Sequence, residues 1–269
     1  MKRKRASSGW PLLSSFSSGK GGVGKTIVVI NLAALLAGKG RQVLVVDCDL
    51  GLANVDILLG LRPRQNLYHV LKDEADIREV VIDSGAGFDL MPASSGVSDM
   101  VDISPEDQGR LISQLGTLFH QYDLVLLDTG AGISSPIIRF NHVAHENIIL
   151  LTPEPTSITD AYALIKVLKT RLGRDGFHLV TNVVKDKNEG LGVGKNLARV
   201  AQRFLKANTF YLGHIVEDES VVQSVRKQKV LVQAFPKAAA TACFKDLAGK
   251  IMTWTPRDER DYSRLFAKA

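Results

Sequence analysis

The sequence has few cysteines and no long hydrophobic run, and both absences restrict its class. Cys48 and Cys243 are too few and too far apart for a disulfide framework or a four-cysteine metal site. No run of about eighteen apolar residues occurs, so we expect no membrane-spanning segment. The start, MKRKR followed by serines, lacks the apolar stretch of a signal peptide. A cytoplasmic protein is therefore expected.

The chain carries little net charge beyond its first residues. Its net charge is +6, and the four basic residues from Lys2 to Arg5 supply most of it. Residues 1–10 are interpreted as a basic N-terminal tail, either a solvated end or a contact for anionic lipid or nucleic acid. The rest, with 45% hydrophobic residues overall, can bury a full core. Because no repeat or long linker divides it, residues 11–253 are predicted to form one domain.

Short buried strands alternate with helix-length segments along this domain. The predicted strands are residues 10–16, 42–47, 88–92, 122–128, 147–152, 178–184 and 211–216, the first being Ser-rich and weak. The predicted helices are 27–36, 104–120, 156–172, 197–205 and a final core-facing helix at 244–252. This alternation predicts an α/β fold of three layers, with a mostly parallel central sheet and helices on both faces.

A phosphate-binding loop follows the first predicted strand, in the stretch SSGKGGVGKT. Residues 19–26 match G-x-x-x-x-G-K-[ST], in which backbone N–H groups close around phosphates at the start of a helix. Lys25 is expected to reach the β and γ phosphates, and the Thr26 hydroxyl to ligate Mg²⁺. The residues expected to form the cradle are Gly19, Gly21, Gly22, Val23 and Gly24. The alternative is a glycine-rich turn that matches by chance.

A second lysine, Lys20, stands too early in this loop to share the task of Lys25. The sequence GKGGVGKT resembles the deviant Walker A motif of the MinD/ParA family, in which the early lysine reaches the nucleotide of the other subunit in a dimer. The resemblance implies Mg²⁺-dependent ATP hydrolysis coupled to an ATP-dependent homodimer. Lys20 would then stabilise transition-state charge in trans as a catalytic residue. A solvated loop lysine is the alternative.

Aspartates follow two predicted strands, at the sheet edge where parallel sheets bind ligands. Asp128 ends strand 122–128 in the Walker B position, where a carboxylate holds Mg²⁺ through water; its alternative is a helix cap or a turn. The stretch VDCDLGLANVD resembles switch I of MinD. That resemblance assigns Asp47 to the metal and Asp49 to the attacking water, which makes Asp49 the predicted catalytic carboxylate.

Three stretches resemble the flagellar branch of the family, known as FlhG, YlxH or FleN. They are DCDLGLANVD, DTGAG at 128–132, which is the expected switch II, and TPEPTSITDAYALIK. The resemblance implies an ATP-dependent switch that regulates flagellar number or placement, with an FlhF-like GTPase or flagellar switch proteins as partners. The start of the chain lacks the DQAxxLR segment with which this branch stimulates FlhF, which weakens the expectation of FlhF activation.

The resemblance also predicts where adenine binds. Asn182, at the end of HLVTNVV, and Asp218, after Val216 and Glu217, match the base-binding positions of the family. Val216 stands where a proline is common. A plain turn residue is the alternative for Asn182.

Residues 254–269 are predicted to be an amphipathic helix that targets a membrane. Thr255 and Pro256 have the pattern of a helix start. The apolar face would carry Tyr262, Leu265, Phe266 and Ala269, and the basic face Arg260, Arg264 and Lys268. Such a helix can lie in an anionic membrane surface, as the tails of MinD and FlhG do, which predicts reversible association with the inner face of the cell membrane. The alternative is a tail docked on its own domain.

Competing functions must explain the same phosphate-binding loop. The sequence shows neither the paired cysteines of iron-protein relatives nor the tyrosine-rich tail of bacterial tyrosine kinases. A ParA-type DNA or cargo partitioning ATPase, a MinD-type septum-site protein and a scaffold that dimerises on ATP without hydrolysis stay open. Nucleic acid is not the expected partner, but basic patches cannot be located from the sequence alone.

Overall fold

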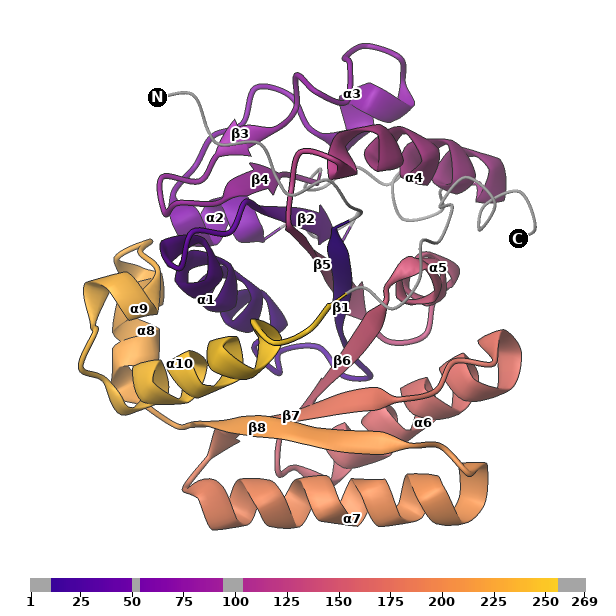
Figure 1. The fold of residues 1–269 in the computed structure, drawn as a ribbon, viewed down its shortest axis with the longest axis vertical. Helices are drawn as coiled ribbons and strands as arrows, with labels where there is room; N and C mark the ends of the chain where they lie inside the picture. Colours follow the sequence, from indigo (N-terminus) through magenta and orange to yellow (C-terminus); the bar gives the residue numbers. More distant parts are fainter. Residues whose placement is uncertain (1–10, 50–53, 94–103, 256–269) are drawn as a thin grey trace.

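The computed structural model describes residues 11–49, 54–93 and 104–255. These residues form one central sheet and the helices around it. Figure 1 shows this sheet, whose strand order is β3-β4-β2-β5-β1-β6-β7-β8. Neighbouring strands are parallel except β3 and β4, which are antiparallel. The strands are β1 Leu12–Ser18, β2 Val43–Cys48, β3 Ile82–Asp83, β4 Asp89–Met91, β5 Leu124–Ala131, β6 Glu146–Leu151, β7 Phe177–Val184 and β8 Thr209–Val216.

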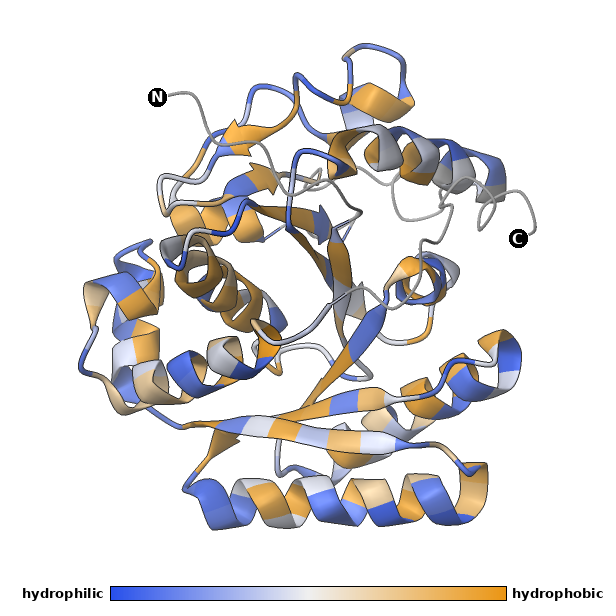
Figure 2. Ribbon diagram, viewed as in Figure 1, coloured by the Kyte–Doolittle hydropathy of each residue, from blue (hydrophilic) through white to orange (hydrophobic). Residues whose placement is uncertain are grey.

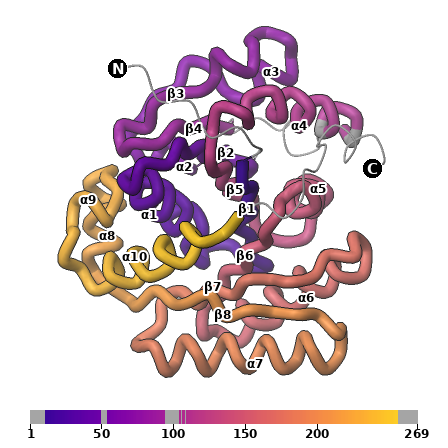
Figure 3. Tube along the Cα trace, viewed as in Figure 1, coloured from indigo at the N-terminus to yellow at the C-terminus, as the bar shows by residue number. Residues whose placement is uncertain are grey.

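Helices cover both faces of the sheet, which confirms the predicted three-layer α/β fold. The apolar cluster on one face includes α1 and α10, while α4 to α7 lie on the other. The helices are α1 Lys25–Gly38, α2 Val55–Leu59, α3 Leu67–Leu71, α4 Pro105–Phe119, α5 Ser135–Val143, α6 Pro155–Leu172, α7 Lys187–Leu205, α8 Glu219–Arg226, α9 Leu231–Ala234 and α10 Ala239–Ile251. Figure 3 shows β1 in the middle of the sheet. Strands β2 to β5 lie on one side of it, and strands β6 to β8 lie on the other.

Local sequence explains where helix α4 begins. Ser104 caps α4 by accepting a hydrogen bond from the Asp107 N–H, and Pro105 occupies the first turn, as predicted. Helix α1 is hydrophobic on nearly every side, as Figure 2 shows, because it is enclosed by the sheet, α9 and α10. The start of α4 thus follows a capping rule that is visible in the sequence, and the composition of α1 follows from its burial.

Helix α7 begins at Lys187 rather than at residue 197, so the predicted start was wrong. Asp186 caps it, accepting hydrogen bonds from the N–H groups of Asn188 and Glu189. Gly190 and Gly194 discourage a helix locally. They are required by tertiary packing, since a Cβ on Gly194 would lie 2.4 Å from Tyr211 Cδ2.

The Ser-rich first strand is fully buried at the centre of the sheet. It spans Leu12 to Ser18 and pairs with β5 and β6, so it starts and ends two residues later than predicted. Helices α2, α3, α5, α8 and α9 and the antiparallel strand β3 are further elements that the sequence analysis did not identify.

The final core-facing helix is present as α10. Phe244, Leu247 and Ile251 are buried in it, and the Trp254 ring then stacks on His178 with the centroids 4.4 Å apart. The predicted membrane-targeting segment lies, from residue 256 on, outside the described residues. None of the described helices combines the length and apolar content that crossing a membrane requires.

Candidate nucleotide site

The phosphate-binding loop lies between β1 and α1, at the carboxyl end of the central strand. Gly22 and Gly24 have φ angles of 77° and 88°, in the left-handed region that favours glycine. A Cβ on Gly24 would also lie 2.4 Å from Asn182 Nδ2, and a Cβ on Gly19 would lie 2.1 Å from the Asp160 carbonyl oxygen. The backbone geometry therefore requires glycine at these positions.

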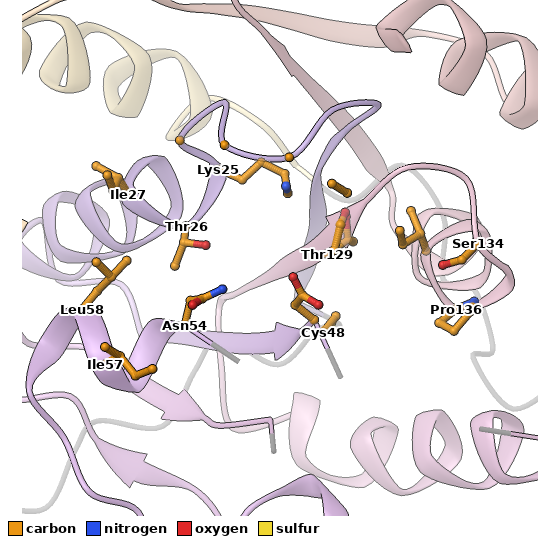
Figure 4. A pocket seen from close by; sticks show the side chains of 17 residues that line it. Lys25, Thr26, Ile27, Cys48, Asn54, Ile57, Leu58, Thr129, Ser134 and Pro136 are labelled. Carbon is orange, nitrogen blue, oxygen red and sulfur yellow. The ribbon is translucent and has the colours of Figure 1, made fainter. Parts of the chain in front are cut away.

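The loop opens into a cavity of about 630 Å³. Figure 4 shows Lys25 and Thr26 on one side, with Thr129 and Cys48 across from them. The cavity is completed by the first residues of α2 and α5, including Asn54, Ile57, Ser134, Pro136 and Ile137. A cavity of this size, lined by a glycine loop, Lys25 and the Asp49 carboxylate, is suited to a nucleotide.

Lys25 is the cation of this cavity. Its Nζ donates a hydrogen bond to Ser18 Oγ at 3.0 Å, and the Ser18 hydroxyl donates to the Lys20 carbonyl at 2.7 Å. Burial lowers the pKa of Lys25, while the charges of Asp128 and Asp49 act in the opposite direction. Phosphate oxygens entering the cavity would supply the anionic partners that a buried ammonium group needs.

Asp47, one residue before the end of β2, and Asp128, three residues before the end of β5, are register partners on neighbouring parallel strands. Asp128 Oδ1 is buried and has no hydrogen-bond partner among the described residues. Burial raises the pKa of Asp128 to about 7, while a hydrogen bond from Thr26 and the charge of Lys25 lower it. Burial and the nearby Asp128 charge raise the pKa of Asp47, which accepts the N–H groups of Asp49 and Asn54 at 3.0 and 3.2 Å.

These groups fit a Mg²⁺ ion. Two buried carboxyls, one with an unpartnered oxygen, and the Thr26 hydroxyl are the hard oxygen donors that Mg²⁺ prefers. Among the described residues, no three His, Cys, Asp or Glu side chains gather as a metal site. In most Mg²⁺ sites, phosphates and water supply the majority of the ligands.

Asp49 lines the same cavity, one residue beyond β2. A Cβ placed on Gly130 would lie 3.4 Å from Asp49 Oδ1, so the carboxylate is close to the predicted switch II. The structure therefore brings together the residues predicted for phosphate, metal and water.

Lys20 points instead toward the start of α6. Its Nζ pairs with Glu154 and also donates to Thr156 Oγ1 at 3.2 Å. Within one chain, the lysine is therefore held away from the cavity by α6. The contact of Lys20 with the nucleotide of the other subunit stays a prediction.

The two residues predicted for adenine are held in different ways. Asn182 is 8% exposed, and its Nδ2 donates to the Val23 carbonyl of the phosphate-binding loop at 2.8 Å. Asp218 caps α8, accepting the N–H groups of Ser220 and Ala240, and these hydrogen bonds lower its pKa. Asn182 thus contacts the loop directly, whereas Asp218 joins α8 to α10. Their contacts with adenine stay predictions.

Sequence reasoning missed several groups around the cavity. Thr129 was recognised only as part of switch II, and its hydroxyl bonds Ser17 Oγ at 2.8 Å. Glu154 and Asp160, which contact Lys20 and Gly19, lie in TPEPTSITDAYALIK. That stretch was noted for its resemblance without a role. The available signal was its position directly after a predicted parallel strand.

Comparison with known proteins agrees with this geometry. The family model described as "AAA domain" matches residues 13–174. Antiactivator FleN of Pseudomonas aeruginosa is 40% identical over 94% of this chain and 90% of its own length. Flagellum site-determining protein YlxH of Helicobacter pylori is 34% identical over 89% of this chain and 81% of its own length.

A solved structure of MinD from Pyrococcus horikoshii complexed with Mg-ADP has the same fold. The TM-score is 0.75 at 24% identity, over 90% of this chain and 96% of that one. The residues around the cavity, the fold and the extent of these matches lead to one assignment. The chain belongs to the MinD/ParA family of P-loop ATPases, in the flagellar branch that includes FleN and YlxH.

Proposed function

We propose that this ATPase is a dimerising switch that regulates flagellar number or placement, closed by ATP and opened by hydrolysis. The observation that carries the proposal is that Lys25 and Asp49 line one cavity, with the charge of Asp128 acting on Lys25 and a second lysine directed away. The names of two similar proteins, an antiactivator and a flagellum site-determining protein, support the flagellar role.

Each group has a chemical task in this proposal. The loop N–H groups and Lys25 bind the phosphates, while Asp47, Asp128 and Thr26 would hold Mg²⁺. Bound Mg²⁺ would neutralise charge that develops on the phosphoryl oxygens. Asp49 accepts a hydrogen bond from the attacking water and orients it. Lys20 of each subunit would act on the nucleotide of the other.

The partners and the location belong to the same proposal. An FlhF-like GTPase or flagellar switch proteins would recognise the ATP-bound homodimer. Residues 254–269 would bring it reversibly to the inner face of the cell membrane, and a dimer would bind more strongly because it presents two tails. Flotation with anionic liposomes and ATP should carry the intact chain but not a chain ending at Trp254. Equal flotation of both would remove the tail from the proposal.

A pull-down with the Asp49→Ala variant and ATP tests the flagellar role. This variant should remain dimeric, and its captured partners should be flagellar proteins. The wild-type chain with ADP is the matched control, because it should be monomeric and capture less. Recovery of septal or chromosomal proteins by the ATP-locked form would contradict the flagellar role and favour one of the alternatives.

One observation favours a second candidate, a ParA-type ATPase that binds DNA nonspecifically. Along α7, Gly190, Gly194, Leu197 and Ala201 face the core, while Lys195, Arg199, Arg203 and Lys206 are exposed on the opposite side. Residues 155–206 contain ten Lys and Arg against four Asp and Glu. Salt-dependent binding to random duplex DNA, lost on Arg199→Glu, would favour this candidate. Absence of binding at low salt would exclude it.

A further inference from the structure

Buried polar side chains interrupt the apolar packing on one face of the sheet. On the face covered by α1 and α10, a single apolar cluster extends from β4 to β8. On the other face the apolar side chains form two clusters, one under α4 and α5 and one under α6 and α7. Between them lie Ser15, Ser17, Asn141 and Asn147, each no more than 1% exposed. Most buried polar side chains in proteins are hydrogen-bonded, and these four are.

These side chains form a continuous hydrogen-bonded chain that starts at the nucleotide cavity. Thr129, which lines the cavity next to Asp128, bonds Ser17 Oγ at 2.8 Å. Ser17 Oγ lies 3.0 Å from Asn141 Oδ1 and 2.8 Å from its Nδ2. The Asn141 Nδ2 group also donates to the Ile137 carbonyl at 2.8 Å, inside α5. Two steps, Thr129 to Ser17 and Ser17 to Asn141, thus connect β5 to helix α5 through the central strand.

The chain continues toward the opposite edge of the sheet. Asn147 Nδ2 donates to Ser15 Oγ and to the Asn141 carbonyl, both at 2.8 Å. Arg174 Nε donates to Asn147 Oδ1 at 3.1 Å, and its Nη2 to the His145 carbonyl at 3.1 Å. Because each of these polar groups has partners, the network holds α5 in one position relative to β1.

The position of α5 matters for the cavity. Its cap and first turn, Ser134, Pro136 and Ile137, line the cavity beside Gly130 and Ala131. A shift of α5 along β1 would move this wall and the 130–134 loop with it. Apolar residues in place of the buried serines and asparagines of the network could pack equally well. They would not fix a directional register between α5 and β1, the strand that leads into the phosphate-binding loop.

We infer that Asn141 and Ser17 are positioning residues for ATP hydrolysis, which act by holding α5 and the switch II loop in register with the phosphate-binding loop. Neither residue lines the cavity, and both act through Thr129 and the first turn of α5. This inference rests on the proposed function, because it assumes that the 130–134 loop responds to the γ phosphate.

The central test compares three full-length variants by kcat, KM for ATP and thermal unfolding. Asn141→Leu removes the amide and leaves the Ser15 and Ser17 hydroxyls without it, so both stability and kcat should fall. Asn141→Leu with Ser15→Ala and Ser17→Ala replaces both sides by apolar groups and should recover stability. It should still have kcat reduced about tenfold or more, with KM within about threefold, since a lost orienting hydrogen bond corresponds to that change.

Ser15→Ala alone is the matched control, because it removes hydrogen bonds to Asn141 and Asn147 but leaves Asn141 bonded to Ser17, and Ser17 to Thr129. Its unfolding temperature should fall while its kcat stays within about twofold of wild type. Thr129→Ser, which retains the hydroxyl, should keep kcat, and Thr129→Val should lose it. Recovery of both stability and kcat in the triple variant would show that the network is merely structural. A wild-type chain with no ATP-dependent dimer would instead contradict the proposed function.

Discussion

Replacing Glu154 by Gln should make ATP-induced dimerisation easier. Glu154, at the start of α6, pairs with Lys20, and Thr156 Oγ1 accepts a second hydrogen bond from the same ammonium group at 3.2 Å. If Lys20 acts on the nucleotide of the other subunit, it must leave both partners before the dimer closes. The pair therefore competes with dimerisation, and Glu154→Gln removes its ionic part while keeping the side-chain shape.

The size of this effect follows from the exposure of the pair. The side chains of Lys20 and Glu154 are 39% and 61% exposed, so solvent screens their attraction. Exposed pairs contribute about 0.2–1 kcal/mol. Two lysines are released per dimer, so the gain is about 0.4–2 kcal/mol, or about 2-fold to 30-fold in the association constant. Thr156→Val, which removes a neutral acceptor only, should have a smaller effect.

Sedimentation or light scattering over a protein concentration series, with a nonhydrolysable ATP analogue, measures the association constant directly. Glu74→Gln is a suitable control, since it neutralises an exposed carboxylate that does not line the cavity. Lys20→Ala should lose the dimer altogether. An unchanged or lower association constant for Glu154→Gln would show that the ion pair does not oppose closure, and the reasoning from Lys20 would fail.

Much of the fold was predictable because helix-start patterns and runs of buried apolar residues are both visible in the sequence. Helix α4 was identified from its Ser-Pro start, and β5 from an apolar run that ends in Asp128. The carboxyl ends of parallel strands share one edge, so Asp47, Asp49 and Asp128 were expected close together, and the structure places them there.

What the sequence could not reveal depends on contacts between distant segments. The serines of β1 reduce its strand signal, yet Asn141, Asn147 and Thr129, from three other elements, supply hydrogen bonds to Ser15 and Ser17. Likewise, Gly190 and Gly194 weaken the local helix signal and are explained only by Tyr211 packed against them. Secondary-structure propensity describes the local preference of a residue, whereas these residues are explained by packing and hydrogen bonds with distant segments.

Three further substitutions test the site. Asp49→Ala should retain ATP binding but trap the dimer, which light scattering and phosphate release would detect; undiminished turnover would contradict its assignment. Lys25→Ala should lose nucleotide binding, whereas Lys20→Ala should keep affinity within about tenfold in a titration, since only Lys25 lies in the cavity. Asp128→Asn should separate metal binding from folding. Burial penalises the charged form of Asp128, so a neutral amide should not lower the unfolding temperature of the nucleotide-free protein. The amide is a weaker ligand, however, so the Mg²⁺ concentration needed for half-maximal turnover should rise by about tenfold or more. An unchanged Mg²⁺ requirement, with the nucleotide-free protein as stable as wild type, would remove Asp128 from the metal site.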